Sequence, residues 1–202
     1  MIFLNFKTYP ETSGQKAVNL CQIIQNTPSP VKITPCLQTA DLKQVTQQLD
    51  FPVWTQHLDT KDIIKQKNFI TGTLLNHSNH SLKLKIISQT LALCHQHQLK
   101  VMVITDSLDQ IEEVTKLHPD YLGFEDPKLI GGPTPMVQAH PELIKKAVNL
   151  SQQPLIVGGG IRSREDIKKS LKLGAKGVLI ASEFAKSNDP QKTLKDLIQG
   201  FN

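Results

Sequence analysis

The chain has 202 residues, of which 39 % are hydrophobic and 20 % charged, with a formal net charge of +5. This composition is ordinary for a water-soluble globular protein, and no apolar run approaches the ~18 residues that a membrane span needs. The opening residues 1–7 are too short and too polar for a signal peptide, so we expect a cytoplasmic protein that does not act at a membrane.

The basic residues are spread along the chain between apolar helix positions, as in Lys145-Lys146 and Lys168-Lys169. A nucleic-acid surface needs them gathered on one face, so we expect no nucleic-acid partner. The three cysteines, Cys21, Cys36 and Cys94, are odd in number and lack metal-ligand spacing. They are interpreted as buried thiols in a reducing compartment, and no metal site is expected.

Eight short apolar runs are interpreted as strands. Their apolar residues are nearly continuous, as in strands that are buried on both faces of a parallel sheet. In chain order the expected strands are residues 2–6, 31–34, 52–56, 69–75, 100–104, 120–125, 154–158 and 177–181.

Segments with helical periodicity lie between these runs. Residues 17–24, 86–94 and 194–201 each carry apolar side chains three and four positions apart. Eight strand–helix units without a linker most simply close into one (β/α)8 barrel, a single domain over residues 1–202 with trimmed helices and loops. A doubly wound open sheet is the alternative, but its dinucleotide-binding fingerprint is absent after the first strand.

Polar residues follow three of the expected strands. Asn5 and Lys7 come at the end of the first, His77 after the fourth and Glu125 at the end of the sixth. The carboxyl ends of barrel strands meet at one mouth, so these side chains are expected to lie together. An amide, an ammonium, an imidazole and a carboxylate suit proton transfer on a phosphorylated carbonyl compound.

Two loops suit phosphate binding and closure. The run Gly158-Gly159-Gly160 follows the seventh strand, and Ala181-Ser182 follows the eighth, which is where barrels characteristically bind phosphate. After Glu125, residues 126–133 place small and rigid residues around a short apolar tip, which is typical of a hinged lid.

With these residues in order, the chain resembles triosephosphate isomerase, in its compact archaeal-type branch, over nearly the whole length. The order and spacing of the matching pieces are specific, although each piece is weak alone. The pieces are Asn5-Phe6-Lys7-Thr8-Tyr9-Pro10, Gln56-His57-Leu58-Asp59, residues 72–78, Glu125 with Leu129-Ile130-Gly131, residues 158–161 and residues 177–182.

The resemblance implies an aldose–ketose isomerase of glycolysis and gluconeogenesis that interconverts glyceraldehyde 3-phosphate and dihydroxyacetone phosphate through an enediolate. It implies that Glu125 is the base, that His77 is the electrophile, and that Lys7 binds phosphate and stabilises the enediolate. Neither a metal nor an organic cofactor is implied. The implied substrate-binding residues are Asn5, Lys7, Ile130, Gly131, Gly160, Ala181 and Ser182.

Three departures from the family pattern stand out. Asn79, His80 and Ser81 replace a charged run that begins with glutamate, and the lid reads Ile130-Gly131-Gly132-Pro133 instead of Ile-Gly-Thr-Gly. The stretch from Asp59 to Phe69 is also much shorter than the arm that clasps the usual dimer. A monomer, or an oligomer that uses another surface, is therefore expected.

Two further hypotheses stay open. The sequence Gly158 to Arg162, GGGIR, also resembles the loops of histidine-biosynthesis barrels, which allows another phosphosugar isomerase of that type. Asn79 favours a phosphosugar-binding barrel whose catalysis is weakened or lost.

Overall fold

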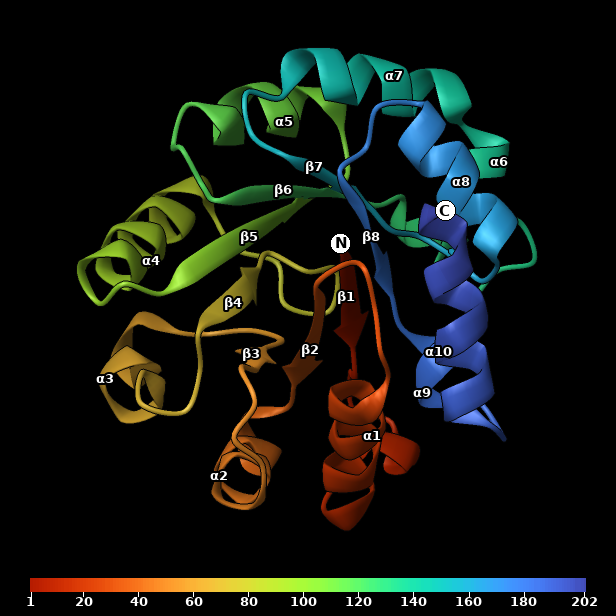
Figure 1. Ribbon diagram of the computed structural model, residues 1–202. Helices are drawn as coiled ribbons and strands as arrows, with labels where there is room; N and C mark the ends of the chain where they lie inside the picture. Colours follow the sequence, from red (N-terminus) through yellow and green to blue (C-terminus); the bar gives the residue numbers. More distant parts are fainter.

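The computed structural model describes all 202 residues, and its eight strands form a closed parallel barrel in sequence order. Figure 1 shows the strands around the centre and the helices outside them. The predicted (β/α)8 fold is therefore confirmed. The strands are β1 (Ile2–Asn5), β2 (Ile33–Leu37), β3 (Trp54–Thr55), β4 (Gly72–Leu75), β5 (Lys100–Thr105), β6 (Tyr121–Phe124), β7 (Leu155–Val157) and β8 (Gly177–Ile180).

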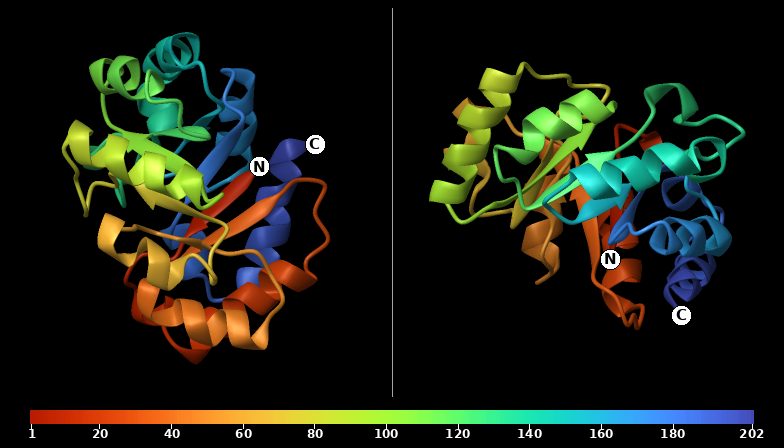
Figure 2. Two further views of the ribbon diagram at one scale, coloured as in Figure 1. Left: turned by 90° about the vertical axis from the view of Figure 1, so that its left-hand side faces the viewer. Right: turned by 90° about the horizontal axis from the view of Figure 1, so that it is seen from above.

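Every strand is followed by at least one helix on the outer face of the barrel, as the side and top views show (Figure 2). The helices are α1 (Gln15–Asn26), α2 (Thr39–Gln48), α3 (Ile63–Gln66), α4 (Leu84–Gln96), α5 (Leu108–Thr115), α6 (Met136–Ala139), α7 (Pro141–Leu150), α8 (Arg164–Lys172), α9 (Ser182–Ala185) and α10 (Pro190–Ile198). Short 3-10 turns lie at Pro10–Thr12, Thr60–Asp62, Pro127–Leu129 and Gln199–Phe201.

One strand lies later in the chain than predicted. The apolar run 31–34 was expected to end before Pro35, but β2 covers Ile33–Leu37 with Pro35 inside it. Pro35 pairs in register with Leu4 of β1, whereas the short β3 pairs only with Cys36 and Leu37. A proline lacks an N–H, and at this position β3 offers no ladder bond that it would interrupt.

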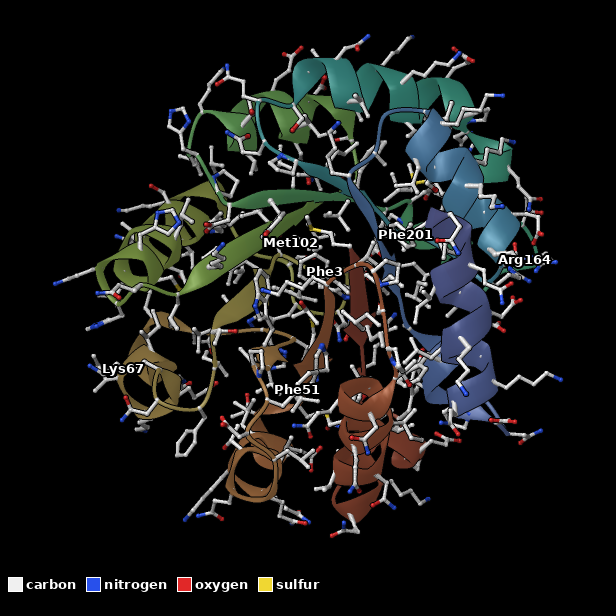
Figure 3. All side chains as sticks on the ribbon, viewed as in Figure 1. Phe3, Phe51, Lys67, Met102, Arg164 and Phe201 are labelled. Carbon is white, nitrogen blue, oxygen red and sulfur yellow. The ribbon has the colours of Figure 1, made fainter.

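The strand residues alternate between two cores. Inward-pointing side chains fill the barrel, where Phe3 packs against Trp54 with ring centroids 5.0 Å apart. Figure 3 labels Phe3 and Met102, which both lie near the barrel centre. Outward residues such as Leu4 and Phe124 join the larger core beneath the helices. This alternation places Asn5 and Glu125 on the inner side, at the carboxyl end of the barrel.

The segment between β3 and β4 is short, as expected, and contains one 3-10 turn and the four-residue α3. The helix α3 contains two consecutive isoleucines, Ile63 and Ile64, either of which has an apolar side chain that could cover the barrel. Only Ile63 does so, being fully buried, whereas Ile64 is 57 % exposed. A single helical turn presents one apolar face, so two consecutive residues cannot both reach the core.

The three cysteines are free and buried, as predicted. Burial raises the pKa of the Cys94 thiol to about 12, with a smaller contribution from Asp120, so this thiol is not activated for chemistry. None of the helices is both long enough and apolar enough to span a lipid bilayer.

Candidate functional site

The predicted site residues line one cavity at the carboxyl ends of the strands. Its volume is about 130 Å³, below the roughly 300–1,000 Å³ of pockets for drug-sized ligands. The cavity therefore suits a small, polar molecule. The predicted residues in its wall are Asn5, Lys7, His77, Glu125, Ile130, Gly131, Gly160, Ala181 and Ser182.

Lys7 owes its place to a turn directly after β1. Its backbone has the left-handed φ of 48°, and its N–H donates to Asn5 Oδ1 at 2.9 Å. Gln56 donates from Nε2 to the Lys7 carbonyl at 3.3 Å, so the loop after β3 also holds this turn. Asn5 thus orients Lys7 in addition to lining the cavity.

The Lys7 ammonium stands in a partly desolvated place. Burial lowers its pKa from the ordinary 10.5, and the nearby Glu125 carboxylate opposes that shift. A cation that water solvates poorly gains more from meeting an anion than an exposed lysine does. This environment suits a residue that binds phosphate or a developing oxyanion.

His77 reaches the cavity because the chain turns sharply before it. Asn76 adopts a left-handed φ of 60°, which asparagine tolerates better than most residues. Its amide donates to the Ile104 carbonyl at 2.8 Å and accepts from Leu82 N–H at 2.8 Å. Asn76 therefore pins the loop that carries His77, and the imidazole itself is 2 % exposed.

Asn79 contacts the far side of the imidazole. Its Oδ1 lies 2.7 Å from His77 Nδ1, and its backbone N–H points at the same nitrogen from 3.5 Å. A carboxamide can present either its oxygen or its NH2 group, so it can serve either neutral tautomer of His77. The glutamate expected from the resemblance would accept only, so this contact differs in kind.

Two further histidines occupy the neighbouring loops. His80 lies 3.2 Å from Asp59 through Nε2, and its ring stacks on His57 with centroids 4.9 Å apart. Burial lowers the pKa of His57, as does His80, while Asp59 raises it and His77 lowers it slightly further. His57 therefore adds no positive charge beside His77 at neutral pH.

Glu125 directly follows β6 and is 6 % exposed. Its Oε1 accepts from Gly159 N–H at 3.2 Å, while its Oε2 is buried without a hydrogen-bond partner. His77 Nε2 lies 3.4 Å from this Oε2. One carboxylate oxygen is thus held by the glycine loop and the other lies buried against the imidazole, while the side chain as a whole borders the cavity, where a general base is needed.

The glycine run after β7 fits around this carboxylate. A Cβ on Gly158 would collide with Oε1 of Glu125 and come within 2.6 Å of its Cγ. Gly159 and Gly160 have φ of 78° and 85°, a region that favours glycine. The loop then enters α8 through a capping box between Ser163 and Asp166.

The expected lid follows Glu125 and contacts the glycine loop. Asp126 caps the 3-10 turn Pro127–Leu129 by accepting from Lys128 N–H at 2.9 Å, and Gly131 has a left-handed φ of 74°. The Gly159 carbonyl accepts from Met136 N–H at 2.8 Å, just beyond the lid. A movement of the lid would therefore displace the glycine loop as well.

Sequence reasoning missed three polar residues of the cavity wall, Tyr9, Arg162 and Glu183. Arg162 belongs to the GGGIR motif and Glu183 follows Ser182, so each adjoins a residue that was predicted. The signal for Arg162 and Glu183 was their place beside the two phosphate loops, and for Tyr9 its place two residues after Lys7. No group of three or more His, Cys, Asp or Glu side chains is placed to hold a metal ion.

Fold and cavity together define a (β/α)8 barrel of the phosphate-binding isomerase or synthase type. A family model described as "Histidine biosynthesis protein" matches residues 98–201, which is 104 of the 202 residues. Over 98 % of its length the chain is 31 % identical to triosephosphate isomerase of Methanobrevibacter smithii and 32 % identical to that of Methanosarcina acetivorans, covering 97 % of each. The chain belongs to the family of these archaeal proteins, and over residues 98–201 to the histidine biosynthesis family.

Solved structures of other barrel enzymes share the fold. A mutant tryptophan synthase α-subunit from Pyrococcus furiosus has a TM-score of 0.71 at 12 % identity, covering 98 % of this chain and 96 % of that one. N-acetylmannosamine-6-phosphate 2-epimerase from Clostridium perfringens has a TM-score of 0.66 at 16 % identity, covering 96 % and 90 %. Thiamine phosphate pyrophosphorylase from Pyrococcus furiosus has a TM-score of 0.70 at 16 % identity, covering 98 % and 94 %. At these identities the likeness concerns the fold alone.

These findings correct the assignment that the resemblance implied. The prediction that the chain is a triosephosphate isomerase of the compact archaeal branch was wrong. The matching family model, over residues 98–201, is that of histidine biosynthesis, whereas the two relatives named triosephosphate isomerase are 31 % and 32 % identical. The findings support a phosphate-binding barrel but no particular reaction. They do not support the expectation that the protein acts in glycolysis and gluconeogenesis. Motifs at strand ends are shared among barrels, so they identify a site more readily than a substrate.

Proposed function

We propose that this protein is a phosphosugar isomerase of the GGGIR-loop barrel type, which moves a proton between adjacent carbons of a small phosphorylated hydroxy-carbonyl compound. The observation that carries the proposal is the pairing of Glu125 and His77 inside the cavity. Glu125 Oε2 lacks a hydrogen-bond partner and lies 3.4 Å from His77 Nε2, and both side chains line the same cavity.

The proposed reaction divides the work among three side chains. Glu125 takes a proton from the carbon next to the carbonyl and returns it to the neighbouring carbon. His77 polarises the carbonyl and passes a proton between the two substrate oxygens, so that the hydroxyl becomes the new carbonyl as the old carbonyl becomes a hydroxyl. Lys7 stabilises the negative charge that develops on the enediolate oxygen. A carboxylate base beside a neutral histidine is an established combination for this kind of proton transfer, because the neutral imidazole can donate a hydrogen bond while the carboxylate stays ionised.

The substrate's phosphate is proposed to bind between the lid and the two loops after β7 and β8. Gly131, Gly160 and Ser182 all line this part of the cavity. Backbone N–H groups at glycine turns favour anions, and the short side chains let a phosphate approach closely. The small cavity supports a substrate of few carbons.

The test is an isomerisation assay with phosphorylated aldoses and ketoses of three to six carbons. We expect at least one to be interconverted, and Glu125→Gln to lower its turnover by orders of magnitude without loss of folding. Glu142→Gln is the matched control, because Glu142 is an exposed carboxylate on α7 that pairs with Lys145. Turnover by Glu125→Gln equal to that of the unaltered protein would overturn the role of Glu125.

A second function is favoured by Asn79, which contacts His77 where a charged partner was expected. It is a barrel that binds phosphosugars with weakened or lost catalysis. With the same panel of phosphosugars, this function predicts binding in a calorimetric titration, while the isomerisation assay shows no conversion above the rate of Glu125→Gln.

A further inference from the structure

The chain uses arginine only twice, at Arg162 and Arg164, among 23 Lys and Arg residues. The two lie on opposite sides of Ser163 but have different surroundings. Arg164 pairs with Glu165 at 2.9 Å and Asp196 at 3.7 Å, and Figure 3 labels it at the outer edge of the molecule. Arg162 has no carboxylate partner, and it lines the cavity.

The Arg162 guanidinium joins the lid to the glycine loop. Its Nη2 donates to the Gly132 carbonyl at 2.5 Å, and its Nε donates to the Gly160 carbonyl at 3.3 Å. A guanidinium has five N–H donors in a rigid plane. Two are used by these carbonyls, and the other three make no hydrogen bond within the protein.

The backbone of Arg162 is held firmly even though its side chain is exposed. Its N–H donates to Asp166 Oδ2 at 3.2 Å, and the preceding Ile161 is buried. Asp166 is itself buried, and its other oxygen accepts from Gln138 Nε2 of α6 at 2.7 Å. The backbone of Arg162 is thus fixed relative to both α8 and the segment after the lid.

A phosphate group bound in this cavity needs a second cation beside Lys7 to balance its negative charge. Its wall holds the carboxylates of Glu125 and Glu183 and the cations of Lys7 and Arg162. A phosphate ester brings roughly −1.5 to −2 charges at neutral pH. With Lys7 alone, that anion would enter a site that already has an excess of negative charge. A planar guanidinium also matches two phosphate oxygens, which an ammonium cannot do.

We propose that Arg162 is a further phosphate-binding residue, one that holds the lid through Gly132 while its free N–H groups contact the substrate's phosphate. This inference rests on the phosphate site of the proposed function and adds a side-chain ligand to it. Phosphate occupancy and lid position are then coupled through one group. The lid's contact with Arg162 is strengthened by the anion that fixes the guanidinium.

The test compares the binding of 2-phosphoglycolate with that of glycolate, which lacks the phosphate, by isothermal titration. The proteins are the unaltered chain, Arg162→Gln, Arg162→Lys and Arg164→Gln. We expect Arg162→Gln to weaken 2-phosphoglycolate binding by about tenfold to a hundredfold, and Arg162→Lys to weaken it less. Arg164→Gln should stay within about twofold, and glycolate binding should not change.

A second readout follows the lid itself. Amide hydrogen exchange over residues 128–134 should slow when 2-phosphoglycolate binds the unaltered chain, and should slow much less in Arg162→Gln. Thermal unfolding midpoints that match among the variants establish that each is folded.

The outcomes separate the two claims. An unaltered chain that fails to bind 2-phosphoglycolate overturns the proposed function and the role of Arg162 together. An unaltered chain that binds it, with Arg162→Gln binding equally well, overturns the role of Arg162 alone.

Discussion

At the scale of single residues, Lys7 shows how a site residue costs stability. Its cation is half-buried beside Glu125, and burial outweighs that carboxylate in lowering its pKa below 10.5. Below the lowered pKa, the folded protein carries a charge that water solvates better in the unfolded chain. This cost is present at neutral pH and is relieved as the pH rises through the folded-state pKa toward 10.5, because there the unfolded chain binds more protons.

Lys7→Met is therefore expected to raise the thermal unfolding midpoint at pH 7 and to abolish measurable binding of 2-phosphoglycolate. The gain in stability should shrink as the pH approaches 10.5, where the unaltered lysine is neutral in the folded protein. Calorimetric melts across this pH range, with ligand titrations at pH 7, measure both effects. A variant that melts lower than the parent and binds as well would contradict both roles of Lys7.

The sequence indicated which side chains lie together, but not the backbone conformation that orients each of them. Asn5, Lys7 and Glu125 were predicted from their places at the ends of strands, and they line one cavity. His77 was predicted from its place after an apolar run, although the left-handed turn at Asn76 is what delivers it. Such turns depend on contacts with distant segments, here the Ile104 carbonyl of β5, and these are not visible in a local pattern.

At the scale of elements, the end of β7 is fitted to the end of β6. Gly158 donates from its N–H to the Phe124 carbonyl at 3.0 Å, and Glu125 occupies the space where a Gly158 side chain would be. The position of the carboxylate is thus set by a neighbouring strand. A shift of ~1 Å in a reacting group is enough to cost a large factor in rate.

Gly158→Ala is expected to lower kcat by orders of magnitude through displacement of Glu125, while the barrel still folds, because Gly158 has no positive φ. In the background of Glu125→Asp the same change should cost less, since the shorter side chain leaves room for the added methyl group. This non-additivity, measured as a double-mutant cycle on kcat, reports direct coupling. Strictly additive effects would show that Gly158 does not position Glu125.

Element boundaries show where local patterns are insufficient. The strand–helix alternation predicted all eight strands, and apolar spacing predicted α1, α4 and α10. The range of β2 was misplaced because Pro35 reads as a strand breaker, and its tolerance depends on how short β3 is. The role of Arg162 was also not predicted, because Gly132 and Gly160, which accept its hydrogen bonds, come together only in the fold.

At the scale of the whole molecule, the short connection from β3 to β4 bears on assembly. It contains α3, Ile63–Gln66, and no extended arm, and Ile64 remains 57 % exposed on its surface. We expect a monomer, or an oligomer that uses another surface, in multi-angle light scattering at micromolar concentration. A two-fold dimer in which residues 59–69 insert into the partner's cavity would contradict this expectation.

Glu125 is proposed to move a proton on a phosphorylated hydroxy-carbonyl compound held in this cavity. The most direct measurement is NMR detection of deuterium incorporation from D2O at the carbon next to the carbonyl of the substrate that the panel identifies. We expect exchange at that carbon by the unaltered protein, and a loss of orders of magnitude in Glu125→Gln but not in Glu142→Gln. Deuterium incorporation by Glu125→Gln at the rate of the unaltered protein would contradict this role of Glu125.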